Sequence, residues 1–123
     1  MGDLPTSKDQ AYNIEKNKNF EKIFNNISKE LSKTYNRDAV LPSFENVEGI
    51  IKIKYPQNEN KELIINLRNY VNDNRIQVNI ITSGEKRSKH TQEFSGDLSK
   101  KVDIQKLTNE ITTWTLEKID KYA

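Results

Sequence analysis

The chain has 123 residues, a formal net charge of +2 and no cysteine. Its length fits one small domain, because a second core would have to form from about 60 residues, where burial is already marginal. The lack of cysteine excludes thiol catalysis, disulfides and thiolate metal sites, and a single histidine, His90, excludes a two-histidine metal site. So small a surplus of charge does not indicate a nucleic-acid or membrane partner, because such binding needs a concentrated basic face.

The composition is skewed, since 16 Lys, 15 Asn and 14 Ile stand against 4 Arg, 3 Ala and 4 Gly. This skew indicates an AT-rich coding genome, which supplies Lys and Asn at any tolerant surface position. A single Lys or Asn is therefore weak evidence for a functional site. No window approaches the roughly 18 consecutive apolar residues of a membrane-spanning helix.

The first predicted element is a long amphipathic helix from about Ser7 to Asn36. Residues 1–6 contain a glycine and a proline and indicate a flexible tail, whereas residues 7–123 are expected to form a single α+β domain. Ser7 and Gln10 have the spacing of a capping box. The apolar stripe of the helix repeats at steps of three and four residues and comprises Phe20, Ile23, Phe24, Ile27 and Leu31.

Four strands with alternating apolar residues are expected after a connector that contains Pro42. They run from Val47 to Tyr55, Leu63 to Val71, Ile76 to Ile81 and Lys89 to Leu98, and the last is polar enough to be an edge strand. Loops this short join antiparallel neighbours, so we expect a four-stranded meander covered by the helix. The strand residues expected to pack on the helix are Ile51, Ile53, Leu63, Ile65, Leu67, Ile76, Val78 and Ile80.

A C-terminal helix is expected to begin at Asp103, which offers an N-cap. Its apolar stripe has three possible places: beside the first helix, across the outer sheet face over Ile50, Ile64 and Ile81, or against a second chain. The short connector favours packing within the chain, and hence a monomer over a dimer. Trp114 lies on this stripe, where it either enters the core or anchors a partner.

The sequence predicts no catalytic site. His90 lies in a polar segment without an evident orienting partner, and an exposed side chain is expected there. Neither Glu45 with Glu48 nor Glu59 with Glu62 is expected to share a face, because no helix brings each pair together. The glycines form no phosphate-binding loop. We therefore expect no enzyme activity, no metal and no cofactor.

The sheet face turned away from the helix is the candidate binding surface. Pairing Ile53 with Ile65 would set Arg68 opposite Ile50 and near Asn79, with Tyr70 near Gln77. An anionic partner could bind there, with Tyr70 offering a stacking plane for a base, and the alternative is a solvated face. The candidate residues are Lys52, Lys54, Arg68, Tyr70, Gln77 and Asn79, together with Lys86, Arg87 and Lys89 of the following hairpin.

A long helix followed directly by an antiparallel meander, over Ser7 to Leu98, resembles the cystatin-like fold. The cystatin inhibitors carry a Gln-x-Val-x-Gly hairpin, whereas this chain has only Gln77-Val78 within a strand, so the resemblance does not imply protease inhibition. The chain is more similar to small cystatin-like lipoproteins of AT-rich Gram-positive bacteria. Residues 1–7 resemble the mature start of such a lipoprotein, with Met1 in place of the lipidated cysteine.

Two functions are therefore expected, from different classes. The resemblance implies a non-catalytic accessory or interaction domain that binds another protein. Such a domain would be extracytoplasmic and would touch the membrane only through a lipid anchor. The alternative is a cytoplasmic binder of nucleic acid or of an anionic protein, which would use the basic sheet face.

Overall fold

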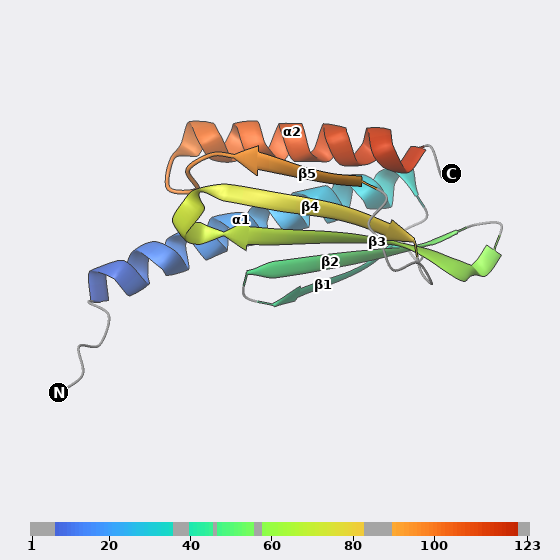
Figure 1. The fold of residues 1–123 in the computed structure, drawn as a ribbon, viewed down its shortest axis with the longest axis horizontal. Helices are drawn as coiled ribbons and strands as arrows, with labels where there is room; N and C mark the ends of the chain where they lie inside the picture. The colour runs from blue at the N-terminus through green and yellow to red at the C-terminus, as the bar shows by residue number, and fades with distance from the viewer. Residues whose placement is uncertain (1–6, 36–39, 46, 56–57, 83–89, 121–123) are drawn as a thin grey trace.

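The fold is an α+β arrangement in which two helices cover one face of an antiparallel sheet (Figure 1). The computed structural model describes residues 7–35, 40–45, 47–55, 58–82 and 90–120. Residues 1–6, the predicted tail, are outside the described residues, and the side chains of Ser7 and Gln10, the predicted capping box, are not described. In chain order the elements are α1 (Ser7–Thr34), β1 (Val40–Glu45), β2 (Glu48–Tyr55), β3 (Asn58–Tyr70), the short 3-10 helix η2 (Val71–Asp73), β4 (Arg75–Thr82), β5 (His90–Ser95) and α2 (Lys101–Asp120).

The sheet has five strands in the order β1-β2-β3-β4-β5, so each strand pairs with its neighbours along the chain. The prediction of four strands was wrong, because Pro42, which is typical of a connector, lies within the additional strand β1. Proline is tolerated on an edge strand, where no second neighbour needs its missing N–H group. The predicted polar edge strand is confirmed as β5, which forms the opposite margin.

The register between β2 and β3 differs by two residues from the predicted one, since Ile51 faces Ile65 and Ile53 faces Leu63. The predicted loop is largely part of β3, which begins at Asn58, so the hairpin closes earlier than expected. A shift of two residues leaves every side chain on its own face of the sheet. The core is therefore unaffected, but the neighbours on the outer face change.

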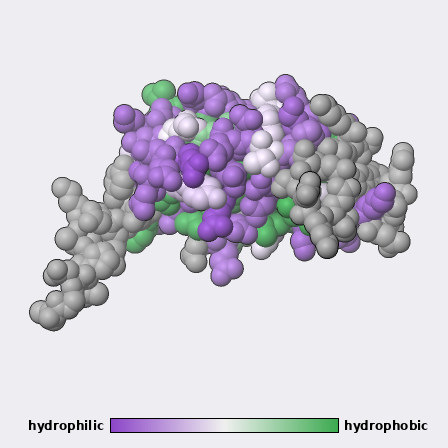
Figure 2. Space-filling view, in the orientation of Figure 1, coloured by the Kyte–Doolittle hydropathy of each residue, from purple (hydrophilic) through white to green (hydrophobic). Residues whose placement is uncertain are grey.

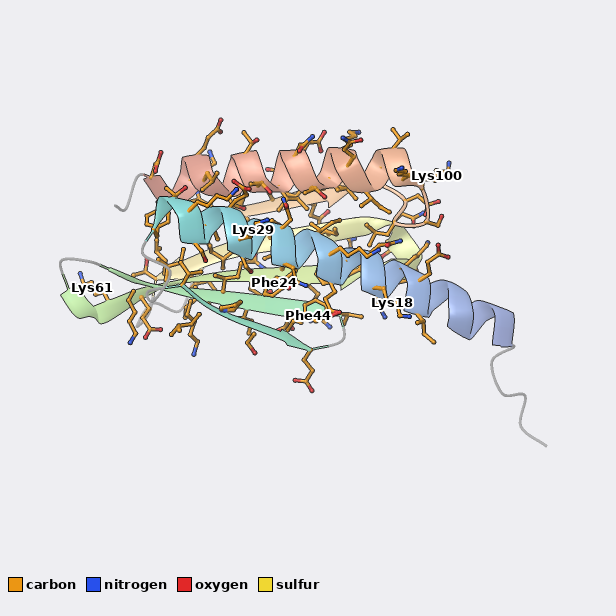
Figure 3. The ribbon with its side chains drawn as sticks, turned by 180° about the vertical axis from the view of Figure 1, so that it is seen from behind. Lys18, Phe24, Lys29, Phe44, Lys61 and Lys100 are labelled. Atoms are coloured by element: carbon orange, nitrogen blue, oxygen red, sulfur yellow. The ribbon has the colours of Figure 1, made fainter. Side chains whose placement is uncertain are left out.

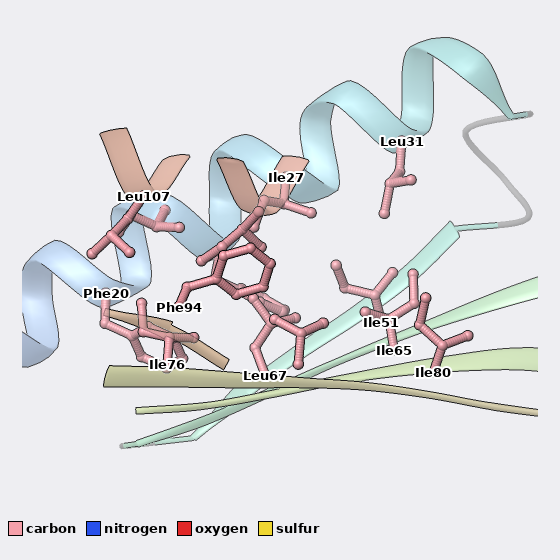
Figure 4. Packing of buried hydrophobic residues seen from close by; sticks show 14 of the residues in the cluster. Phe20, Ile27, Leu31, Ile51, Ile65, Leu67, Ile76, Ile80, Phe94 and Leu107 are labelled. Atoms are coloured by element: carbon pink, nitrogen blue, oxygen red, sulfur yellow. The ribbon is translucent and has the colours of Figure 1, made fainter. Parts of the chain in front are cut away.

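The core lies between α1 and the inner face of the sheet, and Figure 4 shows its side chains interdigitating. Every residue predicted for the helix stripe and for its strand partners is buried. Phe24 packs against the backbone of Gly49 in β2, where an added Cβ would collide with the ring. Phe44 of β1 adds a third ring beside Phe20 and Phe24, with centroids 5.6 and 5.3 Å away. Figure 3 labels Phe24 and Phe44.

Helix α2 packs beside α1 and along β5, which is the first of the three predicted alternatives (Figure 3). Its stripe buries Leu107, Ile111 and Ile119 in the common core. The N-cap prediction was wrong, because α2 begins at Lys101 and Asp103 lies in its first turn. The Asp103 carboxylate instead accepts a hydrogen bond of 2.9 Å from the backbone N–H of Asp97 in the preceding loop.

A buried lysine joins three segments at one end of the molecule. Lys16 of α1 is 5% exposed, and its Nζ donates to Oδ1 of Asn74 at 2.8 Å and lies 3.8 Å from Oδ1 of Asp97. Asn74 has a left-handed backbone with φ of 49°, which asparagine adopts more readily than most residues. Hydrogen bonds from Ser99 hold the pKa of the Asp97 carboxyl below its usual value, with a smaller effect from the charge of Lys16.

Candidate functional site

The outer face of the sheet holds the six strand residues predicted for the binding surface: Lys52, Lys54, Arg68, Tyr70, Gln77 and Asn79. Their neighbours differ from the prediction, since Arg68 faces Glu48 and Gln77, while Tyr70 faces Arg75. Lys86, Arg87 and Lys89 lie outside the described residues. Figure 2 shows that the side of the molecule facing the viewer in Figure 1 is largely hydrophilic.

Acidic side chains alternate with the basic ones on this outer face. By register, the described strands place Glu45, Glu48, Glu62 and Glu93 on the same side as Lys52, Lys54, Arg68 and Arg75. The expectation that Glu45 and Glu48 do not share a face was wrong, because a hairpin sets them directly opposite each other. Equal numbers of carboxylates and cations make the described part of this face neutral, whereas the sequence had indicated a basic face.

The ring of Tyr70 is already occupied by cations. The guanidinium carbon of Arg75 lies 4.5 Å from the ring centroid and that of Arg68 lies 5.5 Å from it. Arg75 also binds Glu93 of β5 through two contacts of 2.9 Å, and it lies 3.6 Å from Asp73. This network ties β4 to β5 and leaves the predicted stacking plane engaged within the protein.

A second feature of the outer face is an apolar row. Ile64 and Ile81 face each other across β3 and β4, and Ile50 lies on the same side of β2; all three are half-buried. Leu41 of β1 lies on the same face and is 44% exposed, but Lys52 lies between it and Ile64. Helix α2 does not cover these residues, because it packs on the opposite face with α1.

The two margins of the sheet differ in their chemistry. On the β1 side, Pro42 lacks an N–H group and blunts the edge against further pairing. β5 contains no proline, and within the described part of the chain only β4 pairs with it. Thr91, Gln92, Glu93 and Ser95 of this strand are exposed.

The orientation of the β5 backbone follows from one hydrogen bond. The N–H of Gly96 donates to the carbonyl of Asn74 at 2.9 Å, and these residues continue the register in which Arg75 faces Ser95. In an antiparallel ladder every second pair is hydrogen-bonded, so even-numbered residues of β5 bond to β4. The N–H and C=O groups of Thr91, Glu93 and Ser95 therefore point away from β4, toward the open margin.

A shallow groove of about 610 Å³ follows this margin and separates it from α2. Phe94 and Trp114 form its apolar part, with the two rings edge to face at a centroid distance of 5.8 Å. Trp114 is half-buried, so one part of the indole contacts the core and another faces the groove. The remaining lining residues are Gln92, Glu93, Ser95, Lys106, Asn109, Glu110, Thr113 and Glu117.

The groove was not predicted from the sequence, apart from Trp114 as a possible partner anchor. The signal available was that Lys106, Glu110, Thr113 and Glu117 recur at helical spacing on one side of α2. From the sequence alone, this stripe indicates an ordinary solvent-exposed helix face. It becomes a groove wall only because α2 lies along the edge strand β5. His90, expected to be exposed, begins β5 and is half-buried.

Among the described residues, no group of three histidine or acidic side chains is arranged to hold a metal ion. No described helix is long and apolar enough to cross a membrane. No family model, no curated protein and no solved structure matches the chain.

Proposed function

We propose that this chain is a non-catalytic protein-interaction domain that receives an extended segment of its partner as a sixth strand beside β5. The observation that carries the proposal is the margin of β5 with which no other described strand pairs; its outward N–H and C=O groups lie beside a groove with an apolar floor. An added strand gains affinity from main-chain hydrogen bonds and specificity from pockets for alternate side chains. β5 supplies the main-chain groups, and the groove supplies such a pocket.

The dimensions of the groove fit such a segment. Along α2, the lining residues extend from Lys106 to Glu117, which corresponds to about 16 Å at the rise of an α-helix. An extended chain covers that length with about five residues. The six residues of β5 offer a ladder of the same length.

The cellular setting belongs to the same proposal. We propose that the domain is cystatin-like and belongs to a Gram-positive surface lipoprotein; the order of a long helix followed by an antiparallel meander supports the first part of this proposal. The gene region upstream of the codon for Gly2 tests this setting. A signal sequence ending in a lipidation-type cysteine there would support it, and a cytoplasmic reading frame without a signal would contradict it.

The function itself is tested by placing a proline on the β5 margin. In the Glu93→Pro variant the missing N–H is one that points away from β4, so the sheet should still form. Peptides selected from a random displayed library against the full chain should lose at least about tenfold in affinity for this variant, since a ladder bond is lost and the proline ring blocks approach. If no selected peptide distinguishes the variant from the unaltered chain, strand addition at β5 is wrong.

A further inference from the structure

We infer that the segment that completes the sheet at β5 is cationic and carries an apolar side chain that packs against Trp114. This inference rests on the proposed function and adds the chemistry of the partner. Three observations carry it: the charge of the groove, the position of the Trp114 indole, and the repulsion between like charges that would arise if two copies of β5 paired.

The charge of the groove is negative. On the α2 wall the carboxylates of Glu110 and Glu117 face the single ammonium of Lys106 among the lining residues, which gives a net charge of −1. Glu93 also lines the groove, but its carboxylate lies on the outer face and is bound by Arg75. Lys106 lies on the same helix as Glu110, with Nζ 3.9 Å from Oε1, so the cation belongs to an exposed pair. Charges across an interface are arranged to complement each other, and like charges set against each other cost affinity. Lys and Arg side chains on the incoming segment match this wall.

The apolar position follows from the pleat of the sheet. The side chains of Gln92 and Phe94 project to the α2 side of β5, whereas those of Thr91, Glu93 and Ser95 project to the outer face. Residues of an added strand opposite Gln92 and Phe94 would likewise project toward α2. There they meet the exposed part of Trp114, which already packs edge to face on Phe94. A large apolar side chain at one of these positions removes both surfaces from water.

A second copy of this chain is a poorer occupant of the margin. Two β5 strands that pair antiparallel through their outward-pointing residues, with Thr91 opposite Ser95, place Glu93 directly opposite Glu93 of the other copy. The same pairing brings two acidic grooves together. A separate cationic segment avoids both repulsions.

The probes are two short peptides of equal length, one in which lysine and valine share one face of the strand and threonine fills the other face, and one in which glutamate replaces every lysine. Fluorescence anisotropy of the labelled peptides measures binding to the full chain at low salt. We expect the lysine peptide to bind at least about tenfold more tightly, as a few ion pairs of modest strength would give. Its affinity should fall as salt is added. Trp114 is the only tryptophan of the chain, so its emission reports contact at the groove.

Two charge-reversal variants test whether the lysine peptide is attracted to the groove itself. Glu117→Lys lies in the groove, whereas Glu45→Lys makes the same change at the exposed outer margin of the sheet, on β1. Glu117→Lys should weaken the lysine peptide and strengthen the glutamate peptide, and Glu45→Lys should change neither by as much. Equal effects of the two substitutions would show that only the overall charge matters, and would overturn the inference.

The outcomes separate the inference from the proposed function. If the glutamate peptide binds more tightly and its binding is lost in Glu93→Pro, the partner's charge is wrong while strand addition at β5 stands. If the peptides bind equally well to the Glu93→Pro chain, or neither binds, the proposed function fails as well. Self-association that Glu93→Pro abolishes would assign the margin to a second copy and overturn the cationic partner.

A second measurement does not depend on the folding of a variant. N-methylation of alternate residues of the lysine peptide removes N–H groups from one side of its strand. One of the two alternating patterns should abolish binding and the other should spare it, because only one side pairs with β5. Equal effects of both patterns would contradict strand addition.

Discussion

Thr115 of α2 lowers the stability of the folded protein through an unpaired hydroxyl. The residue is fully buried, and its hydroxyl has no hydrogen-bond partner among the described residues. An unpaired buried polar group is destabilising, whereas valine preserves the branched shape without it. We predict that Thr115→Val raises the free energy of unfolding by about 1 kcal/mol in urea titrations. The exposed Thr113→Val is the control, and a loss of stability in Thr115→Val would show that the hydroxyl is bonded.

Asp97 gives the stability a defined dependence on pH. Hydrogen bonds from Ser99 lower the pKa of its carboxyl in the folded protein below the usual 3.8. The resulting stabilisation is complete above the unfolded pKa and is lost as the pH falls through the folded one. We predict that Asp97→Ala lowers the melting temperature at neutral pH, and that this difference shrinks below about pH 4. Glu45→Ala, at an exposed carboxylate, is the control, and a difference that persists unchanged in acid would contradict the prediction.

At the level of the elements, periodicity predicted what lies inside. The α1 stripe and the alternating residues of β2, β3 and β4 are buried as expected, because burial of a face depends only on spacing along one element. β1 was missed because Pro42 is typical of a connector, and sequence alone does not show that it lies at an edge. The register was wrong by two residues because both pairings leave the same side chains in the core.

The candidate site could not be predicted in the same way. Its two walls come from β5 and α2, and only their packing makes a groove between them. The acidic neighbours on the described part of the outer face were missed for a related reason, because the prediction considered only the cations of each strand. Glu48 and Glu93, which bond to Asn66 and Arg75, appear as neighbours only once the strands are paired.

The contact between α1 and β2 can be tested at Gly49. A Cβ at this position would lie 2.6 Å from Cε2 of Phe24 and 3.1 Å from its Cγ. We predict that Gly49→Ala costs about 1 to 3 kcal/mol, as overpacking of a core does. In a Phe24→Leu background the same substitution should cost less, because the ring is gone, and the double-mutant cycle of unfolding free energies measures the difference. Additive effects would show that the two residues do not meet.

For the molecule as a whole, α2 is part of the core. Leu107, Ile111 and Ile119 are fully buried together with residues of α1 and the sheet. A chain that ends before Lys101 leaves that apolar surface in water, so we predict an unstable, aggregating product in light-scattering measurements. A stable truncated monomer, combined with a dimeric full-length chain, would instead make α2 an oligomerisation element.

The meander also determines when this protein can fold during its synthesis. Each strand pairs only with the strand before or after it, so every hairpin can form as soon as its second strand has left the ribosome. The core closes differently, because α1 is made first and α2, which packs against it, is made last. A nascent chain halted before Lys101 therefore holds a paired sheet with an open flank, and it needs protection from other chains until α2 emerges.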